Sequence, residues 1–189
     1  VSGRRSYIDA VLNPILSGGT LKVQAPRYYD AQVRLRHRQD SGTLWDAMVF
    51  MSDDQFRFLG VQDGEEQNLA SFSDRFQRAR LRRLGPVGGG PWTSETTLGF
   101  GPERRDFAFG ESDSAAREQD LSLSLRQEIS RPITVDQPLG ARVGVDLLSG
   151  RESFFFDEAR LSVSEEGQSW YLKPAVYGEL ISRVGRLTV

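Results

Sequence analysis

The stretch LSLSLR, residues 121–126, decides the fold, because leucines alternate strictly with serine and arginine. The stretch LGARVGVDL, residues 139–147, continues this alternation over a longer run, and residues 31–38 and 45–51 follow it with few exceptions. Successive side chains of an extended strand point to opposite faces, so a period of two places one face in an apolar medium and the other in a polar one. These runs therefore predict amphipathic β-strands.

Clusters of Gly, Pro, Asp and Ser separate the alternating runs and have the composition of hairpin connections. Short turns alternate with longer polar stretches at residues 62–69 and 110–119. The spacing of the clusters predicts about 8–10 strands, and the fold class that we predict is all-β, an antiparallel up-and-down meander. The predicted turns are residues 39–42, 63–66, 85–91, 111–114 and 164–167.

Three segments depart from this pattern. Residues 5–17 are compatible with a short helix, but Pro14 interrupts it and a pair of glycines ends it. Residues 73–84 (SDRFQRARLRRL) are compatible with a basic helix. The triplet FFF at residues 154–156 breaks the alternation, which predicts a β-bulge or a loop tip there.

Composition argues against several classes of function. The chain has 189 residues and 24 basic against 26 acidic side chains, so it lacks the basic surplus of a general nucleic-acid binder. It has no Cys and His37 is its single His, which argues against a disulfide scaffold, a thiolate zinc site, a cysteine nucleophile and His-based catalysis. We therefore expect no enzyme activity, no catalytic residue, no metal site and no cofactor, and we treat residues 1–189 as a single β-barrel domain or barrel segment.

The period of two leaves open which face of the sheet meets water. A soluble barrel or sandwich has its apolar side chains inside, whereas an outer-membrane barrel has them outside, around a polar lumen. No apolar run is long enough for a transmembrane helix. An Arg-rich polar face, the alternation of short and long connections, and aromatic residues near predicted strand ends favour a transmembrane β-barrel or part of one. These aromatic residues are Tyr28, Tyr29, Trp45, Trp92, Trp170 and Tyr171.

Arginine supplies all but two of the basic residues, the exceptions being Lys22 and Lys173. A GC-rich genome explains this bias, and so does a crowded polar interior in which guanidinium groups form bidentate pairs with carboxylates. The basic run at residues 75–83 is compatible with an anion site or with pairing to carboxylates of neighbouring strands, and we favour pairing. The candidate ligand-binding residues, which we place on the wall of the lumen, are Arg34, Arg36, Arg78, Arg80 and Arg82.

Two other groupings of acidic residues have an ordinary structural explanation that we prefer. Asp46, Asp53 and Asp54 offer oxygen ligands for calcium, but they lack the spacing of an EF-hand. Glu158 and Glu179 are one of many carboxylate pairs that a β-protein of this composition offers, so they do not by themselves predict a glycosidase.

Five short motifs are spread over most of the chain: GRRSYID (3–9), APRYYDAQ (25–32), SDD (52–54), PAVYGEL (174–180) and GRLTV (185–189). They resemble barrel strands of TonB-dependent receptors, most of all the Arg-rich receptors of deltaproteobacteria. The resemblance implies a location in the bacterial outer membrane and energised uptake of a scarce nutrient such as a siderophore, a vitamin or an oligosaccharide. It also implies a TonB-type complex of the inner membrane as the source of energy.

The chain departs from that family in three ways. It has no plug domain and no TonB box, it offers fewer than half of the strands of a barrel of about 22, and Val189 is not the aromatic residue that usually ends an outer-membrane barrel. The resemblance therefore implies a middle part of a barrel, or a small barrel descended from one. Its expected partners are the lipid bilayer, the remaining strands or plug, a TonB-type complex and a small-molecule ligand, and not nucleic acid.

Two alternatives belong to other classes of protein. One is a soluble β-barrel or jelly-roll module that binds a lipid or a carbohydrate, with its leucines and valines facing inwards. The other is a structural outer-membrane barrel in an envelope complex, where the barrel is an anchor and nothing is transported.

Overall fold

The structure, a computed structural model, is all-β and describes residues 1–5, 21–62, 65–110, 114–133, 139–158, 163–184 and 187–188. Seven long strands and two short ones make up this part of the chain. They are β1 (Ser2–Arg5), β2 (Leu21–Arg38), β3 (Leu44–Gln62), β4 (Glu65–Pro86), β5 (Thr93–Phe109), β6 (Ser114–Arg131), β7 (Leu139–Glu158), β8 (Val163–Val184) and β9 (Leu187–Thr188).

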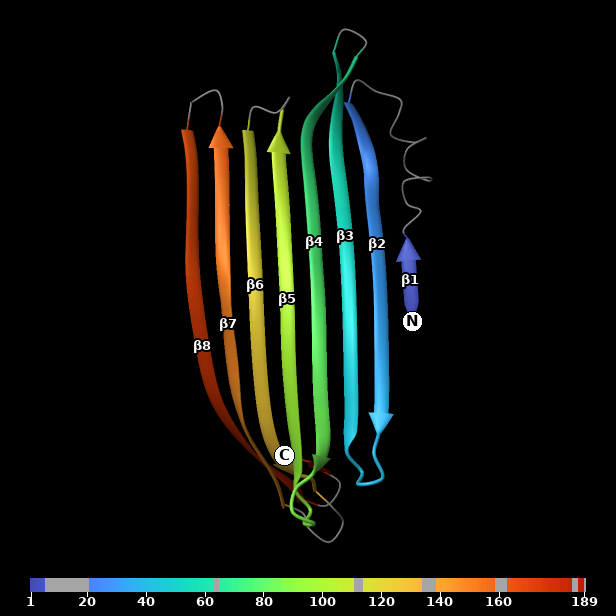
Figure 1. The fold of residues 1–189 in the computed structure, drawn as a ribbon, viewed down its shortest axis with the longest axis vertical. Helices are drawn as coiled ribbons and strands as arrows, with labels where there is room; N and C mark the ends of the chain where they lie inside the picture. The colour runs from blue at the N-terminus through green and yellow to red at the C-terminus, as the bar shows by residue number, and fades with distance from the viewer. Residues whose placement is uncertain are drawn as a thin grey trace.

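Strands that follow one another in the sequence are neighbours in the sheet, and every pair is antiparallel. Figure 1 shows the resulting meander of long, nearly upright strands, which bends where β7 and β8 approach their lower ends. The sheet is open, since no pairing among the described residues joins its first strand to its last. The predicted antiparallel up-and-down meander is confirmed, and the described strands fall within the predicted number. No helix in the described ranges is long and apolar enough to cross a bilayer.

The strands are longer, and the connections shorter, than we predicted. The stretches 62–69 and 110–119, predicted as long polar connections, belong largely to strands, because β4 begins at Glu65 and β6 at Ser114. Polar side chains there belong to strand faces that meet water or other polar groups, so polarity alone did not mark a loop. The connection that joins β2 to β3 is a turn as predicted, closed by the hydrogen bond from Gly42 N to Gln39 O at 2.9 Å, with Gly42 at a φ of 83°.

The segment at residues 73–84, whose composition is also compatible with a basic helix, is part of β4, as the favoured interpretation of this run as an alternating strand expects. Ala79 and Leu81 face apolar residues of neighbouring strands, and the arginines between them point to the opposite face. One further prediction was wrong. The turn predicted at residues 164–167 lies inside β8. Gly167 serves there to leave space, since a Cβ at this position would collide with the ring of Phe154 on β7.

The phenylalanine triplet at residues 154–156 forms neither a bulge nor a loop tip. Its residues lie within β7 and pair in unbroken register with β6 and β8. The helix considered at residues 5–17 and parts of the turns at 63–66 and 111–114 lie outside the described residues, apart from Arg5, which ends β1.

Candidate functional site

One face of the sheet carries a continuous apolar band, and we call it the apolar face. Residues that lie directly opposite one another from β2 to β8 form rows across the sheet, and one row is apolar from end to end. Its members are Leu35, Ala47, Leu81, Leu98, Leu125, Leu147 and Pro174. The adjacent row on the same face is apolar except for Ser149 and consists of Val33, Val49, Ala79, Phe100, Leu123, Ser149 and Leu172.

These apolar side chains are exposed rather than packed in a core. Leu123 in the middle of the sheet is 55% exposed and Val176 on β8 is 78% exposed. We define the apolar band as the large exposed apolar residues of this face, namely Val33, Leu35, Val49, Met51, Leu81, Leu98, Phe100, Leu121, Leu123, Leu125, Ile129, Leu139, Val143, Val145, Leu147, Trp170, Leu172, Val176 and Leu180. A patch that runs across seven strands is far larger than a soluble monomer normally exposes.

The height of the apolar band fits a bilayer best on the later strands. It runs from residue 121 to 129 on β6, from 139 to 147 on β7 and from 170 to 180 on β8, close to the 9–11 residues with which a tilted strand crosses a bilayer. On β4 it narrows to Ala79 and Leu81, between Gln77 and Arg83. On β7 the band extends to Leu139 and Val143, which lie nearer the end of the sheet where β7 begins than the rows of Val33 and Leu35 do, so the band runs obliquely to the rows.

The long strands continue well past one side of the apolar band, and there the two faces exchange character. On the apolar face the band gives way to charged residues such as Asp53, Arg75 and Arg104. On the opposite face, which we call the polar face, phenylalanines gather at this end. They are Phe56, Phe58, Phe72, Phe107, Phe109, Phe154 and Phe156, with the rings of Phe72 and Phe107 4.9 Å apart. Beyond the apolar band, the same face of the sheet is therefore charged.

Ion pairs connect the strands on the polar face. Among their members, Asp46 on β3 has the most buried side chain, which is 1% exposed. Its carboxylate accepts hydrogen bonds from Arg34 Nη2 at 2.5 Å and from Arg36 Nε at 2.8 Å. Arg80 Nη2 lies 3.7 Å from the same carboxylate. Because Arg34 belongs to β2 and Arg80 to β4, Asp46 connects three neighbouring strands, and its burial is compensated by guanidinium groups.

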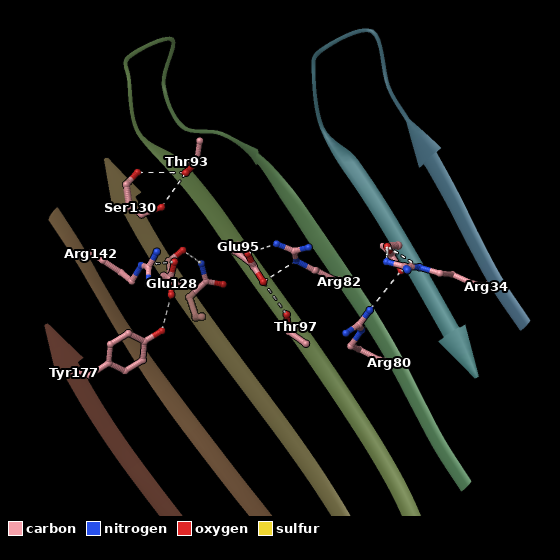
Figure 2. A network of polar contacts seen from close by, with 12 residues as sticks. Arg34, Arg80, Arg82, Thr93, Glu95, Thr97, Glu128, Ser130, Arg142 and Tyr177 are labelled. Atoms are coloured by element: carbon pink, nitrogen blue, oxygen red, sulfur yellow. Dashed lines mark hydrogen bonds and ion pairs between the residues drawn. The ribbon is translucent and has the colours of Figure 1, made fainter. Parts of the chain in front are cut away.

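The same arrangement recurs across the sheet (Figure 2). Arg82 on β4 donates two hydrogen bonds of 2.6 Å to Glu95 on β5. Thr97 Oγ1 donates a further one of 3.5 Å to Glu95. Arg126 on β6 is paired in the same bidentate way with Asp146 on β7, at 2.6 and 2.7 Å. Cross-strand pairs of opposite charge therefore follow the polar face from β2 to β7.

Two tyrosines of β8 reach across β7 to carboxylates of β6. Tyr177 donates a hydrogen bond of 2.8 Å to Glu128, and Tyr171 donates one of 3.2 Å to Asp120. The ring of Tyr177 lies over Gly144, where a Cβ would come within 2.5 Å of the tyrosine oxygen. A glycine on the intervening strand is thus required for this contact.

Charge is layered on the polar face. A basic layer lies behind the apolar band, and an acidic layer lies between it and the phenylalanines; Arg78 pairs with Glu103 across the boundary. The basic layer consists of Arg34, Arg36, Arg78, Arg80, Arg82, Arg126, Arg142 and Lys173, with Asp46, Glu95, Glu128 and Asp146 among them. The acidic layer consists of Asp30, Asp54, Asp74, Glu103, Glu118, Asp120 and Glu152, with Arg4 and Arg105 among them.

The structure places all five candidate ligand-binding arginines, Arg34, Arg36, Arg78, Arg80 and Arg82, on the polar face and within the basic layer. Four of them have close carboxylate partners. For Arg78 and Arg82 this is the pairing that we favoured for the basic run, while Arg80 has only the distant contact to Asp46. Sequence reasoning did not include Lys173 among the candidates. Its position between the apolar residues Leu172 and Pro174 is the pattern that could have placed it on the polar face.

The other groupings are not brought together. Asp46 and Asp53 point to opposite faces of β3, and Glu158 and Glu179 lie near opposite ends of the sheet. No group of three metal-ligating side chains occurs within the part of the chain that the structure describes. Comparison of the chain with protein-family models, with curated proteins and with solved structures finds no match.

Proposed function

We propose that this chain is a wall segment of an outer-membrane β-barrel, similar to that of a TonB-dependent receptor, through which a scarce nutrient is taken up. The observation that carries the proposal is the contrast between the two faces at the same height of the sheet. The apolar band is exposed there, while the polar face buries Asp46 among arginines. Lipid is the medium that suits such an exposed band, and a water-filled lumen suits the charged face.

The projection of the strands past the apolar band supports the same proposal. Beyond the band the apolar face turns charged, with Asp106 Oδ1 accepting a hydrogen bond from Arg117 Nε at 2.7 Å. A barrel that rises out of the membrane would meet water on this side. In a soluble barrel with its apolar face inside, these charged residues would have to enter the core, which is costly.

The open edges support a segment of a larger wall. β8 pairs with β9 only at Arg183 and Val184, and the rest of its outer edge has no partner strand among the described residues. An unpaired backbone group in lipid costs several kcal/mol. A further strand with apolar residues beside Leu172 and Val176 would cover this edge. The neighbouring strand of a larger barrel would have such residues.

The test is to refold the chain in detergent, to mix it with liposomes, and to compare boiled with unboiled samples by gel electrophoresis. The proposal expects aggregation in plain buffer, rescue by detergent and flotation with the liposomes. A mobility shift on boiling would indicate a barrel that closes on itself, and its absence would indicate a segment. A monodisperse protein in plain buffer would overturn the membrane proposal in favour of the soluble binding module.

The transport part of the proposal has its own test in cells that express the gene from which this chain derives. Uptake of the nutrient should stop when the proton gradient of the inner membrane is collapsed, because a TonB-type complex draws its energy from that gradient. Uptake that continues unchanged would contradict energised transport. A barrel that stays in the outer membrane without any uptake would favour the structural anchor.

A further inference from the structure

A hollow of about 640 Å³ opens on the polar face between β4 and β8. The polar side chains around it are Arg80, Arg82, Thr97, Ser124, Arg126 and Lys173, together with Glu95 and Asp146. This volume is in the range of sites that hold small molecules. Positive charge prevails over negative charge among the side chains that surround it.

Two of the four cations are neutralised by the sheet itself. Arg82 is held by Glu95 and Arg126 by Asp146, each through two hydrogen bonds of 2.6–2.7 Å. Each bidentate pair engages two N–H donors of the guanidinium and offsets its charge. These two arginines therefore shape the hollow without adding free charge to it.

The other two cations, Arg80 and Lys173, have no close carboxylate partner. Arg80 has only the contact of 3.7 Å to Asp46, a carboxylate that two other arginines already occupy, and its Nε is buried with no hydrogen-bond partner. No carboxylate of the described ranges lies within ion-pair distance of Lys173, whose ammonium is 4.7 Å from the ring centre of Tyr171. The Arg80 side chain is nevertheless 38% exposed, so its guanidinium is open to an acidic ligand, and hydrogen bonds to a charged group are stronger than those between neutral groups.

Arg80 and Lys173 belong to one row of the sheet, with Gly99, Ser124 and Leu148 between them. Gly99 keeps the row open, because a Cβ there would collide with the hydroxyl of Ser124. That hydroxyl has no hydrogen-bond partner among the described residues and is available as a donor. The row thus offers a cation at each end and a hydroxyl donor between them.

We propose that this hollow binds a small molecule with at least two acidic groups, carboxylate or phosphate, one held by Arg80 and the other by Lys173, with Ser124 donating to the part between them. Four strand spacings of about 4.8 Å separate the backbone positions of Arg80 and Lys173 along the row, so a molecule with two separate acidic groups matches the two cations better than a single phosphate ion does. The inference rests on the proposed function in one respect, namely that the polar face lines a water-filled lumen open to solutes.

The test measures the binding of inositol hexakisphosphate and of inorganic phosphate to the refolded chain in detergent, at fixed salt, by titration calorimetry. The variants are Arg80→Gln, Lys173→Gln and Ser124→Ala. Arg83→Gln is the matched control, because Arg83 lies on the same strand as Arg80 but points to the apolar face. Loss of either cation should lower the affinity for inositol hexakisphosphate about tenfold, while the affinity of the control variant stays within about twofold of the wild type. Lys173→Gln is the decisive variant, since Lys173 supports no ion pair of the fold.

Three results would overturn the proposal: no binding of inositol hexakisphosphate to the wild type, equal binding by wild type and Lys173→Gln, or phosphate binding as tight as that of the hexakisphosphate. Flotation of the same samples with liposomes separates this proposal from the membrane proposal. If the wild type floats but does not bind the anion, only the proposal of an anion site is contradicted. Failure of the wild type to float contradicts the membrane wall, whatever the anion result.

Discussion

The contact between Tyr177 and Gly144 sets a strict limit on the size of a residue on β7. A methyl group at Gly144 would collide with the ring of Tyr177 and displace its hydroxyl, which donates a hydrogen bond of 2.8 Å to Glu128. We expect Gly144→Ala to lower the free energy of unfolding by about 1–3 kcal/mol, as overpacking does. Urea titration in detergent, followed by tryptophan fluorescence, measures it. Gly178→Ala is the control, since its Cβ meets only a carbonyl oxygen at 4.0 Å, and an equal loss in both variants would refute the steric account.

Asp46 should matter more to stability than any other carboxylate of the basic layer. Asp46→Asn leaves Arg34, Arg36 and Arg80 without a shared counter-charge, whereas Asp146→Asn deprives only Arg126. We therefore expect the urea midpoint to fall clearly further for Asp46→Asn than for Asp146→Asn. Equal midpoints in the two variants would mean that Asp46 does not connect the strands.

Sequence alone predicted that arginines line the polar face, but not which of them are paired. Alternation fixes the face of Arg80 and of Lys173, because a strand places every second residue on the same side. The partner of a charge depends on the register between strands, and register is not encoded in one strand. For this reason the shared role of Asp46 and the unpaired Nε of Arg80 emerge only from the assembled sheet.

At the scale of the strand, β6 gives the membrane proposal its clearest test. Leu123 lies within the apolar band, and Gln119 lies on the same face of the same strand, beyond the band. We expect Leu123→Arg to cost about 2–4 kcal/mol in lipid and Gln119→Arg about 0–1 kcal/mol, because the cost of a charge depends on depth. Unfolding of both variants in liposomes measures the difference. Equal costs would contradict the depth assigned to the band.

Errors in the predicted connections have one physical source. Residues 164–167 and 110–119 are polar and contain turn-forming residues, a composition that predicts connections. In this sheet the strands run past the apolar band, so polar residues occupy strand positions on both faces there. Residues 73–84 form a strand rather than the helix with which their composition is also compatible, because pairing with β3 and β5 satisfies the backbone of this segment, and tertiary context of this kind overrides local propensity.

At the scale of the whole molecule, the open edges set the behaviour of the isolated chain. Central strands such as β5 have partners on both sides, whereas β8 lacks one along most of its outer edge in the described structure. We expect every second amide of β8 to exchange with deuterium much faster than the amides of β5 in detergent. Uniform protection of β8 would show that the sheet closes on itself, and the segment proposal would then be wrong.

The central claim is that the apolar face meets lipid while the polar face meets water, and the absence of Cys makes it directly testable. Single cysteines placed in turn at residues 117–126 and spin-labelled report contact with oxygen, which concentrates in lipid, and with a water-soluble nickel complex. For the chain in liposomes, we predict oxygen contact at 121, 123 and 125, nickel contact at 122, 124 and 126, and nickel contact at 117 and 119 beyond the band. Exclusion of both reagents from 121, 123 and 125 would contradict the claim, since it would place these leucines in a protein core.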